Sequence, residues 1–189
     1  MEPAVVIEQP TNYFPQIFNT SMGYEGSALN AKERSKHGVL ESNYHSYLKG
    51  KGKPLQPIES ISFPEVEEIY FNNYYKANNL DRLPLRTAGA VFDWTIHSGS
   101  GNSIPALQKI VGATPDGKLG PKTIAAINAY IEKNGEDALL APYFESRRGF
   151  IERFIKRNNR QDAPGLRNRV DKAERDWLRI NHGIRNLKK

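Results

Sequence analysis

One glutamate in this chain stands where a carboxyl group could do acid–base chemistry. In the stretch MGYEGSAL, Glu25 lies between Gly23 and Gly26, directly after a run of apolar residues with helical spacing. Glycine on both sides is expected to end that helix, and the partial negative charge of a helix C-terminus raises the pKa of a nearby carboxyl group. Such a group can donate a proton to a leaving oxygen. From the spacing alone, a surface glutamate beside a glycine cap is the better interpretation.

The remaining residue types argue against several other kinds of site. The chain has no cysteine, and its four histidines show no H-x-x-x-H or similar ligand spacing. A disulfide framework, a thiol nucleophile and a zinc site are therefore not expected. There is also no glycine-rich phosphate loop and no G-x-S-x-G motif, which argues against nucleotide and α/β-hydrolase chemistry. We expect no metal and no organic cofactor.

The elements that must position Glu25 are helices, and their spacing predicts a mostly α fold. The first helix should begin near Phe14 and end between Gly23 and Gly26. Ser62 and Glu65 form an S-x-x-E capping box that starts the clearest helix. The polar stretch 30–60 should be loop or short irregular strand with a short helix near 41–48. Later helices are expected at 62–80, 84–99, 103–112, 122–135, 137–156 and 166–181.

The bulk composition limits the partners. With 189 residues the chain can form one sizeable core or a core with a small module. A net charge of +6 favours anionic partners such as nucleic acid, anionic lipid or wall polymers. The basic residues that crowd from Arg147 to Lys189 are interpreted as a solvated helical surface, and no nucleic-acid partner is expected because no binding motif accompanies them. No membrane span and no signal peptide are expected either.

Several short motifs, in order along the chain, resemble the glycoside hydrolase family 108 N-acetylmuramidases, which are lysozyme-like. The family's E-G-G-Y-like motif matches at Glu25 and Gly26, with Ser27 in place of the second glycine. Three further motifs follow in the family's order, with His97 in the place of the family's asparagine. They match here at Ser35, Gly38 and Val39, at the stretch IYFNNYY of residues 69–75, and at Phe92, Asp93 and Gly99.

The C-terminal half resembles the peptidoglycan-binding segment of these enzymes. The match lies in ALQKIVGATPDGKLGPKT, where Asp116 and Gly117 should form a tight turn, and in GLRNRV of residues 165–170. The resemblance implies a mostly α, lysozyme-like helical fold with a small helical C-terminal peptidoglycan-binding module. The expected domains are 12–100 and 101–180, with residues 1–11 and 181–189 as flexible tails.

The resemblance implies a peptidoglycan hydrolase that cleaves the β-1,4 bond between N-acetylmuramic acid and N-acetylglucosamine. Glu25 would be the general acid. The second carboxylate stays open: an inverting mechanism needs it at ~6.5–9.5 Å and a retaining one at ~5 Å. Glu33 is the nearest candidate, although a solvated loop charge explains it equally well, and Asp93 suggests a structural role. Ser35 could hold the attacking water.

Substrate contacts and partners follow from the same resemblance. Gly26 would let a sugar approach the backbone, and His37, Tyr44, Tyr75 and Trp94 could contact sugar rings, with core packing or simple exposure as the alternative for each side chain. The partners would be peptidoglycan glycan strands, other anionic envelope polymers, a holin or secretion system, and an immunity protein. The chain would be made in the cytoplasm and act on the wall after release or export, as a bacteriolytic endolysin or a secreted effector. The alternatives are a lytic transglycosylase and an inactive wall-binding protein.

Overall fold

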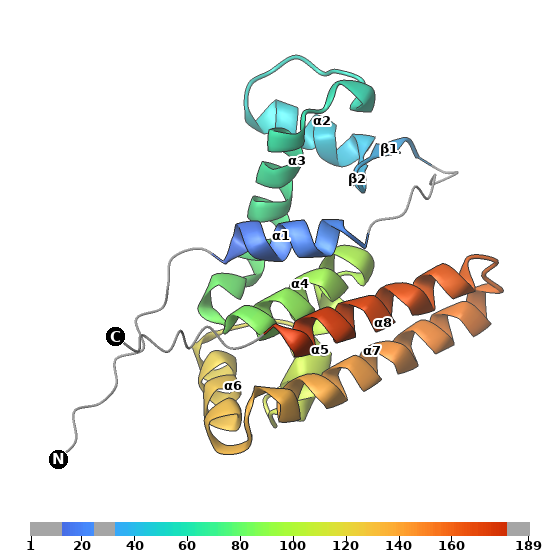
Figure 1. Ribbon diagram of the computed structural model, residues 1–189. Coiled ribbons are helices and arrows are strands. Elements are labelled where there is room, and N and C mark those ends of the chain that lie inside the picture. Colours follow the sequence, from blue (N-terminus) through green and yellow to red (C-terminus); the bar gives the residue numbers. More distant parts are fainter. Residues whose placement is uncertain (1–12, 25–32, 181–189) are drawn as a thin grey trace, which may run out of the picture.

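The computed structural model describes residues 13–24 and 33–180, and helices dominate it (Figure 1). This confirms the predicted mostly α fold. The described residues form eight α-helices and one antiparallel sheet of two two-residue strands, in which Ser35 pairs with Leu40. The elements are α1 Phe14–Met22, β1 Ser35–Lys36, β2 Val39–Leu40, α2 Glu41–Gly50, α3 Phe63–Tyr70, α4 Leu85–Ser98, α5 Ser100–Ile110, α6 Pro121–Asn134, α7 Glu136–Asn158 and α8 Ala163–Arg179.

Helix α3 begins as the sequence predicts but ends early. The backbone N–H of Ser62 donates to Glu65 Oε2 at 3.0 Å, which is one half of the capping box. The α-helix then gives way to a π-helical turn, η2, over Phe71–Tyr75, so the prediction of one helix through residue 80 is wrong. The wider turn places the rings of Phe71 and Tyr75 at 5.0 and 5.2 Å from that of Phe14 on α1.

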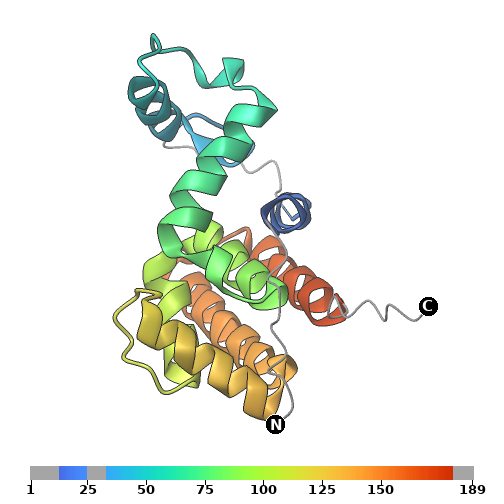
Figure 2. The same cartoon turned by 90° about the vertical axis from the view of Figure 1, so that its left-hand side faces the viewer.

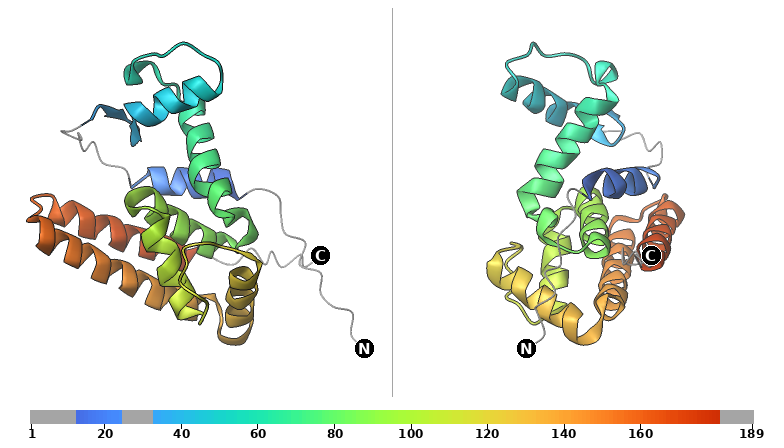
Figure 3. Two further views of the ribbon diagram at one scale, coloured as in Figure 1. Left: turned by 180° about the vertical axis from the view of Figure 1, so that it is seen from behind. Right: turned by 60° about the vertical axis from the view of Figure 1, so that its left-hand side comes forward.

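Helix α3 separates two parts of the molecule. In Figure 2, α1 is seen end-on between a group containing α2 and the small sheet and a bundle of α4 to α8. The views in Figure 3 agree that α2 and the sheet lie at the far end of α3 from that bundle. Helix α1 packs on α4, so the end of α1, where the chain leaves Tyr24, lies against the bundle.

The bundle is organised around α4. Every residue from Arg86 to Thr95 is buried, and α4 packs against α1, α5, α7 and α8. Gly89 provides the close contact with α8, because a Cβ added there would lie 2.3 Å from the ring of Trp177. The resulting apolar core is continuous from α1 to α8, which places α4 in one core with the C-terminal helices.

Two arginines of the basic C-terminal region are part of this core. Arg147 on α7 has no exposed surface and Arg169 on α8 is 7% exposed. Both pair with Asp93 on α4: Arg147 Nη1 lies 2.6 Å from Oδ2, and Arg169 Nη2 lies 2.7 Å from Oδ1. The interpretation of the region as a solvated surface is therefore wrong for these two residues, because a buried carboxylate draws them inward.

None of the helices in the described ranges combines the length and the apolar composition needed to cross a bilayer.

Candidate active site

A cavity of about 440 Å³ lies at the point where α1 ends. Its walls come from the end of α1, the end of α4, the connection between α7 and α8, and the first turns of α8. It brings together residues that are more than 140 positions apart in the sequence. The lining residues are Gly23, Tyr24, His97, Arg160, Asp162, Gly165, Leu166, Asn168, Arg169 and Lys172.

The end of α1 is held by backbone and side-chain hydrogen bonds. The N–H of Gly23 donates to the carbonyl of Asn19 at 3.3 Å, which closes the last turn. The Tyr24 hydroxyl donates to Asp176 Oδ2 on α8 at 2.9 Å, and the Arg169 guanidinium lies 6.0 Å from the Tyr24 ring centroid. Burial and the hydrogen bond to Asp176 raise the pKa of Tyr24. This tyrosine is therefore a neutral anchor that fixes the end of α1 on α8.

The Asp93 cluster lies behind the cavity wall. Burial by itself raises the pKa of a carboxyl group, but the charges of Arg147 and Arg169 outweigh it and hold the pKa of Asp93 below its usual value. One buried carboxylate thus faces two buried guanidinium groups. Asp93 has the structural role that the sequence suggested, although its partners are arginines.

His97 lines the same cavity at the end of α4. Its Nδ1 lies 3.4 Å from the Ser98 hydroxyl. Burial, followed by the charges of Arg169 and Arg147, lowers the pKa of His97 to about 4. The imidazole is therefore neutral at neutral pH and contributes hydrogen-bonding groups, and no charge, to the cavity.

The open side of the cavity is basic. Arg160 Nε donates to Asp162 Oδ1 at 2.7 Å, so these two charges offset each other. Lys172 forms no ion pair within residues 13–24 and 33–180. Lys172 thus adds a positive charge to the open side, which favours an anionic polymer.

The predicted catalytic residues have different positions relative to this cavity. Glu25 and Gly26 lie outside the described residues and directly follow Tyr24 in the chain. Glu33 accepts a hydrogen bond from the N–H of Ser42 at 2.7 Å, in the first turn of α2. The hydrogen bonds from Ser42 lower the pKa of Glu33, so this carboxylate is ionised at neutral pH. Ser35 is half-buried in β1, and neither Glu33 nor Ser35 lines the cavity.

The predicted substrate-contacting side chains do not gather at this cavity. His37 is exposed in the turn between β1 and β2 with φ 51°, and its carbonyl accepts a hydrogen bond from the Tyr70 hydroxyl. Tyr44 and Tyr75 are each 1% exposed, so both side chains are core residues. Trp94 is also buried and lines a different cavity.

Sequence reasoning missed most of the cavity wall. The segment GLRNRV provides Gly165, Leu166, Asn168 and Arg169, and it was interpreted only as part of the binding module. The signal was its resemblance to a family motif, but nothing in the spacing of a C-terminal motif shows that it folds back to Tyr24. Within the described residues, no group of three acidic or histidine side chains is placed to hold a metal ion.

Comparison with known proteins gives the class of this arrangement. Residues 19–99 match the glycosyl hydrolase 108 family, and residues 102–174 match a predicted peptidoglycan domain. The fold and the two matches define a peptidoglycan hydrolase with an N-terminal hydrolase region and a C-terminal peptidoglycan domain. The glycosyl hydrolase 108 match thus covers the N-terminal region of the chain, from the second half of α1 to the end of α4.

One solved structure supports the fold independently. SagA from Brucella abortus superposes with a TM-score of 0.70 at 22% sequence identity, over 87% of this chain and 93% of SagA. At this identity the likeness concerns the fold. Among curated proteins, none matches this chain.

Proposed function

We propose that this protein is an N-acetylmuramidase, which hydrolyses the β-1,4 bond between N-acetylmuramic acid and N-acetylglucosamine with Glu25 as the general acid. One observation carries the proposal. The residue bonded to Glu25, Tyr24, lines a basic cavity whose opposite wall is the GLRNRV segment of α8. The end of α1 and the GLRNRV segment thus meet at one cavity, and Glu25 is the next residue in the sequence after Tyr24.

The chemistry of the cavity suits this reaction. Glycoside hydrolysis needs a proton on the leaving oxygen while an oxocarbenium-like transition state forms. The neutral His97 and the anchored Tyr24 hydroxyl are poor proton donors at neutral pH, because His97 carries no proton to spare and Tyr24 has a raised pKa. Glu25 is therefore the best candidate for the acid. The positive charge of Lys172 would attract the anionic wall polymer to the cavity.

We also propose that Glu33 is the second carboxylate and acts as the base. Glu33 is ionised because of its hydrogen bonds from Ser42, and an ionised carboxylate suits a base that activates water. Ser35 follows two residues later and would hold that water. If Glu33 only caps α2, Glu33→Gln retains most of the activity.

Digestion of purified peptidoglycan tests the function. Wild type should release fragments with a reducing-end muramic acid, and Glu25→Gln should lose activity by at least about a hundredfold, the usual loss for a general acid. Glu132→Gln, which removes an exposed carboxylate on α6, is the matched control and should remain active. Mass spectrometry of the fragments is the readout. A 1,6-anhydro product would show a lytic transglycosylase, and equal digestion by wild type and Glu25→Gln would contradict the assignment of Glu25.

A further inference from the structure

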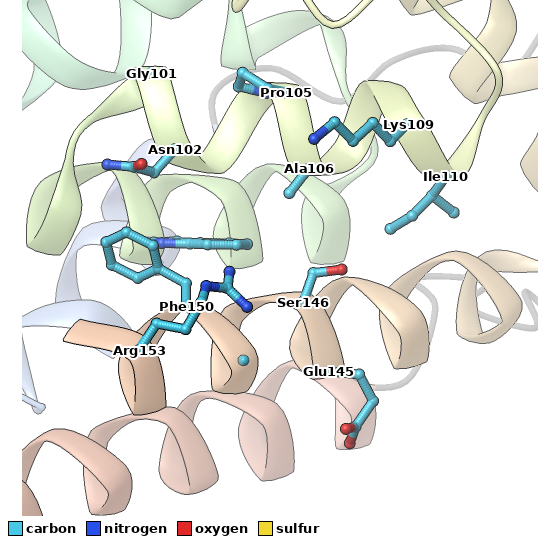
Figure 4. A pocket seen from close by; sticks show the side chains of 12 residues that line it. Gly101, Asn102, Pro105, Ala106, Lys109, Ile110, Glu145, Ser146, Phe150 and Arg153 are labelled. Carbon is cyan, nitrogen blue, oxygen red and sulfur yellow. The ribbon is translucent and has the colours of Figure 1, made fainter. Parts of the chain in front are cut away.

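A second cavity, of about 530 Å³, lies between α5 and α7 and shares no residue with the cavity at Tyr24 (Figure 4). Almost all of its lining belongs to the segment that matches the predicted peptidoglycan domain. Its charged and aromatic lining residues are Trp94, Lys109, Glu145, Phe150 and Arg153, and Gly149 lies among them.

The cavity holds two cations that the protein does not neutralise. Lys109 comes from α5 and Arg153 from α7, and neither forms an ion pair with another residue in the described parts of the chain. Glu145 is the one carboxylate in the lining, but its Oε1 accepts a hydrogen bond from Arg148 Nη1 at 2.8 Å. Figure 4 shows Glu145 directed away from α5. The space between the two helices is therefore positively charged.

The Arg153 side chain extends into that space. In Figure 4, its guanidinium group rises from α7 toward α5. It passes close to Gly149, where an added Cβ would lie 3.2 Å from Arg153 Nη1. A guanidinium group presents a planar donor pair that fits a carboxylate.

The rest of the lining combines apolar residues, such as Ala106, Ile110 and Phe150, with the polar side chains of Asn102 and Ser146. The half-buried ring of Phe150 lies 5.9 Å from that of Trp94. The Trp94 indole N–H is buried and has no acceptor among the described residues, and a buried donor without an acceptor is unfavourable. A ligand suited to these walls would combine a carboxylate with small apolar groups and carbonyl oxygens. A short peptide containing alanine and acidic residues has this composition. A glycan strand freed of its peptides keeps one lactyl carboxylate on each muramic acid, but it lacks the alanine methyl groups and the peptide carbonyl groups.

We propose that this cavity binds the carboxylate-bearing peptide attached to the muramic acid of peptidoglycan. The C-terminal domain thus recognises the peptide of the wall, while the cavity at Tyr24 receives the glycan strand. This inference rests on the proposed function in so far as peptidoglycan is the substrate. It assigns specificity to Lys109 and Arg153, which lie away from the reacting bond.

Cosedimentation with two polymers tests the proposal. One is intact purified peptidoglycan, and the other is the same material after an amidase has removed its peptides. Lys109→Gln combined with Arg153→Gln should weaken binding to intact peptidoglycan by roughly tenfold, the effect of losing charge-assisted hydrogen bonds. The same variant should bind the stripped glycan as wild type does. Binding is measured at 4 °C with Glu25→Gln as the common background, so that the polymers stay intact.

Two further variants sharpen the test. Arg153→Lys keeps both charges but removes the planar donor pair of the guanidinium group, so it should weaken binding to intact peptidoglycan alone. Arg157→Gln removes a neighbouring exposed cation on α7 that does not line the cavity, and it should change neither binding constant by more than about twofold.

The outcomes separate this proposal from the proposed function. If the double variant lost equal affinity for both polymers, the effect would be a non-specific effect of charge, and the proposal would be overturned. The same holds if Arg157→Gln lost as much affinity as the double variant. The proposal would also be overturned if the double variant bound intact peptidoglycan as tightly as wild type does. Cleavage of the stripped glycan, measured with Glu25 restored, should be the same for wild type and the double variant. If wild type cleaves neither polymer, the proposed function fails while the difference in binding still decides the role of the cavity.

Discussion

His97 shows how one residue's surroundings set its chemistry. It occupies the place where the resembling family motif has asparagine, at the wall of the Tyr24 cavity. The groups that act on it are Arg147, Arg169, Asp93 and Asp162. Burial and the two arginines outweigh the two carboxylates, so the imidazole is neutral and serves the role that an amide would serve. A histidine here is chemically a substitute for asparagine at neutral pH.

This arrangement predicts a dependence of stability on pH. The pKa of His97 is about 4 in the folded protein and near 6.5 when unfolded, so only the unfolded chain takes up a proton between these values. Stability is therefore fully present above about pH 6.5 and falls as the pH drops toward 4. His97→Asn removes this titration and should lose less stability from pH 7 to pH 4, by about 1–2 kcal/mol.

Urea unfolding of wild type and His97→Asn at pH 7, 5 and 4 measures that difference. Carboxylates titrate over part of the same range in both proteins, and the comparison cancels their contribution. If both proteins lost the same stability between pH 7 and pH 4, His97 would take up its proton over the same pH range in the folded and the unfolded chain, and the prediction would be wrong.

For single residues, the sequence predicts the role of a residue better than it predicts the residues in contact with it. The turn at Asp116 was predicted from the D-G dipeptide, and Gly117 has a φ of 76°. The buried Gln108 side chain donates to Asp116 Oδ1 at 2.7 Å and accepts a hydrogen bond from the Gly117 N–H at 2.9 Å, and the sequence predicts neither contact. Likewise, Asp93 was expected to be structural, but its arginine partners lie 54 and 76 positions away and no local pattern indicates them.

At the scale of elements, helix starts were predictable where a local chemical signal exists. The capping box at Ser62 and the proline in the first turn of α1 are such signals, and the glycine after α1 likewise marks where that helix ends. The π-helical turn of Phe71–Tyr75 has none, because apolar spacing suits an α-helix and a π-helix equally over five residues. Tertiary packing of its rings on Phe14 accounts for the change.

Helix α4 also depends on one close contact that the sequence does not reveal. Gly89 allows the fully buried ring of Trp177 to lie against the α4 backbone. A methyl group there would overlap the ring at 2.3 Å, and a buried ring cannot move aside easily. Gly89→Ala should therefore destabilise the protein by about 2–3 kcal/mol, despite the better helix propensity of alanine.

Gly50→Ala is the matched control for this prediction. Gly50 is also helical, and a Cβ there meets nothing within 4 Å, so the substitution should be neutral or slightly stabilising. Thermal unfolding followed by circular dichroism compares the two variants. If Gly89→Ala were as stable as wild type, α4 and α8 could move apart without a loss of stability, which would contradict the prediction.

At the scale of the whole molecule, the two family matches meet within one core. The hydrolase match ends at residue 99 and the peptidoglycan match begins at 102, and the sequence predicts a domain boundary there. Yet α4 precedes that boundary and packs on α5, α7 and α8. The cavity at Tyr24 likewise takes one wall from each side. The boundary separates the motifs in the sequence, while the packing joins them.

This packing predicts that the hydrolase region is not stable alone. A fragment of residues 1–100 would keep Asp93 and lose Arg147 and Arg169, leaving a carboxylate without the two charges that compensate its burial. It would also expose the faces of α4 that cover Trp177 and the helices α5 and α7. We expect weak near-ultraviolet circular dichroism, no cooperative thermal transition and no hydrolysis of peptidoglycan. Adding residues 101–180 as a separate chain should restore some of the transition, because the missing helices carry the missing partners. A fragment that unfolds cooperatively and cleaves peptidoglycan at the rate of the full chain would contradict this prediction, and it would place the whole catalytic site before residue 100.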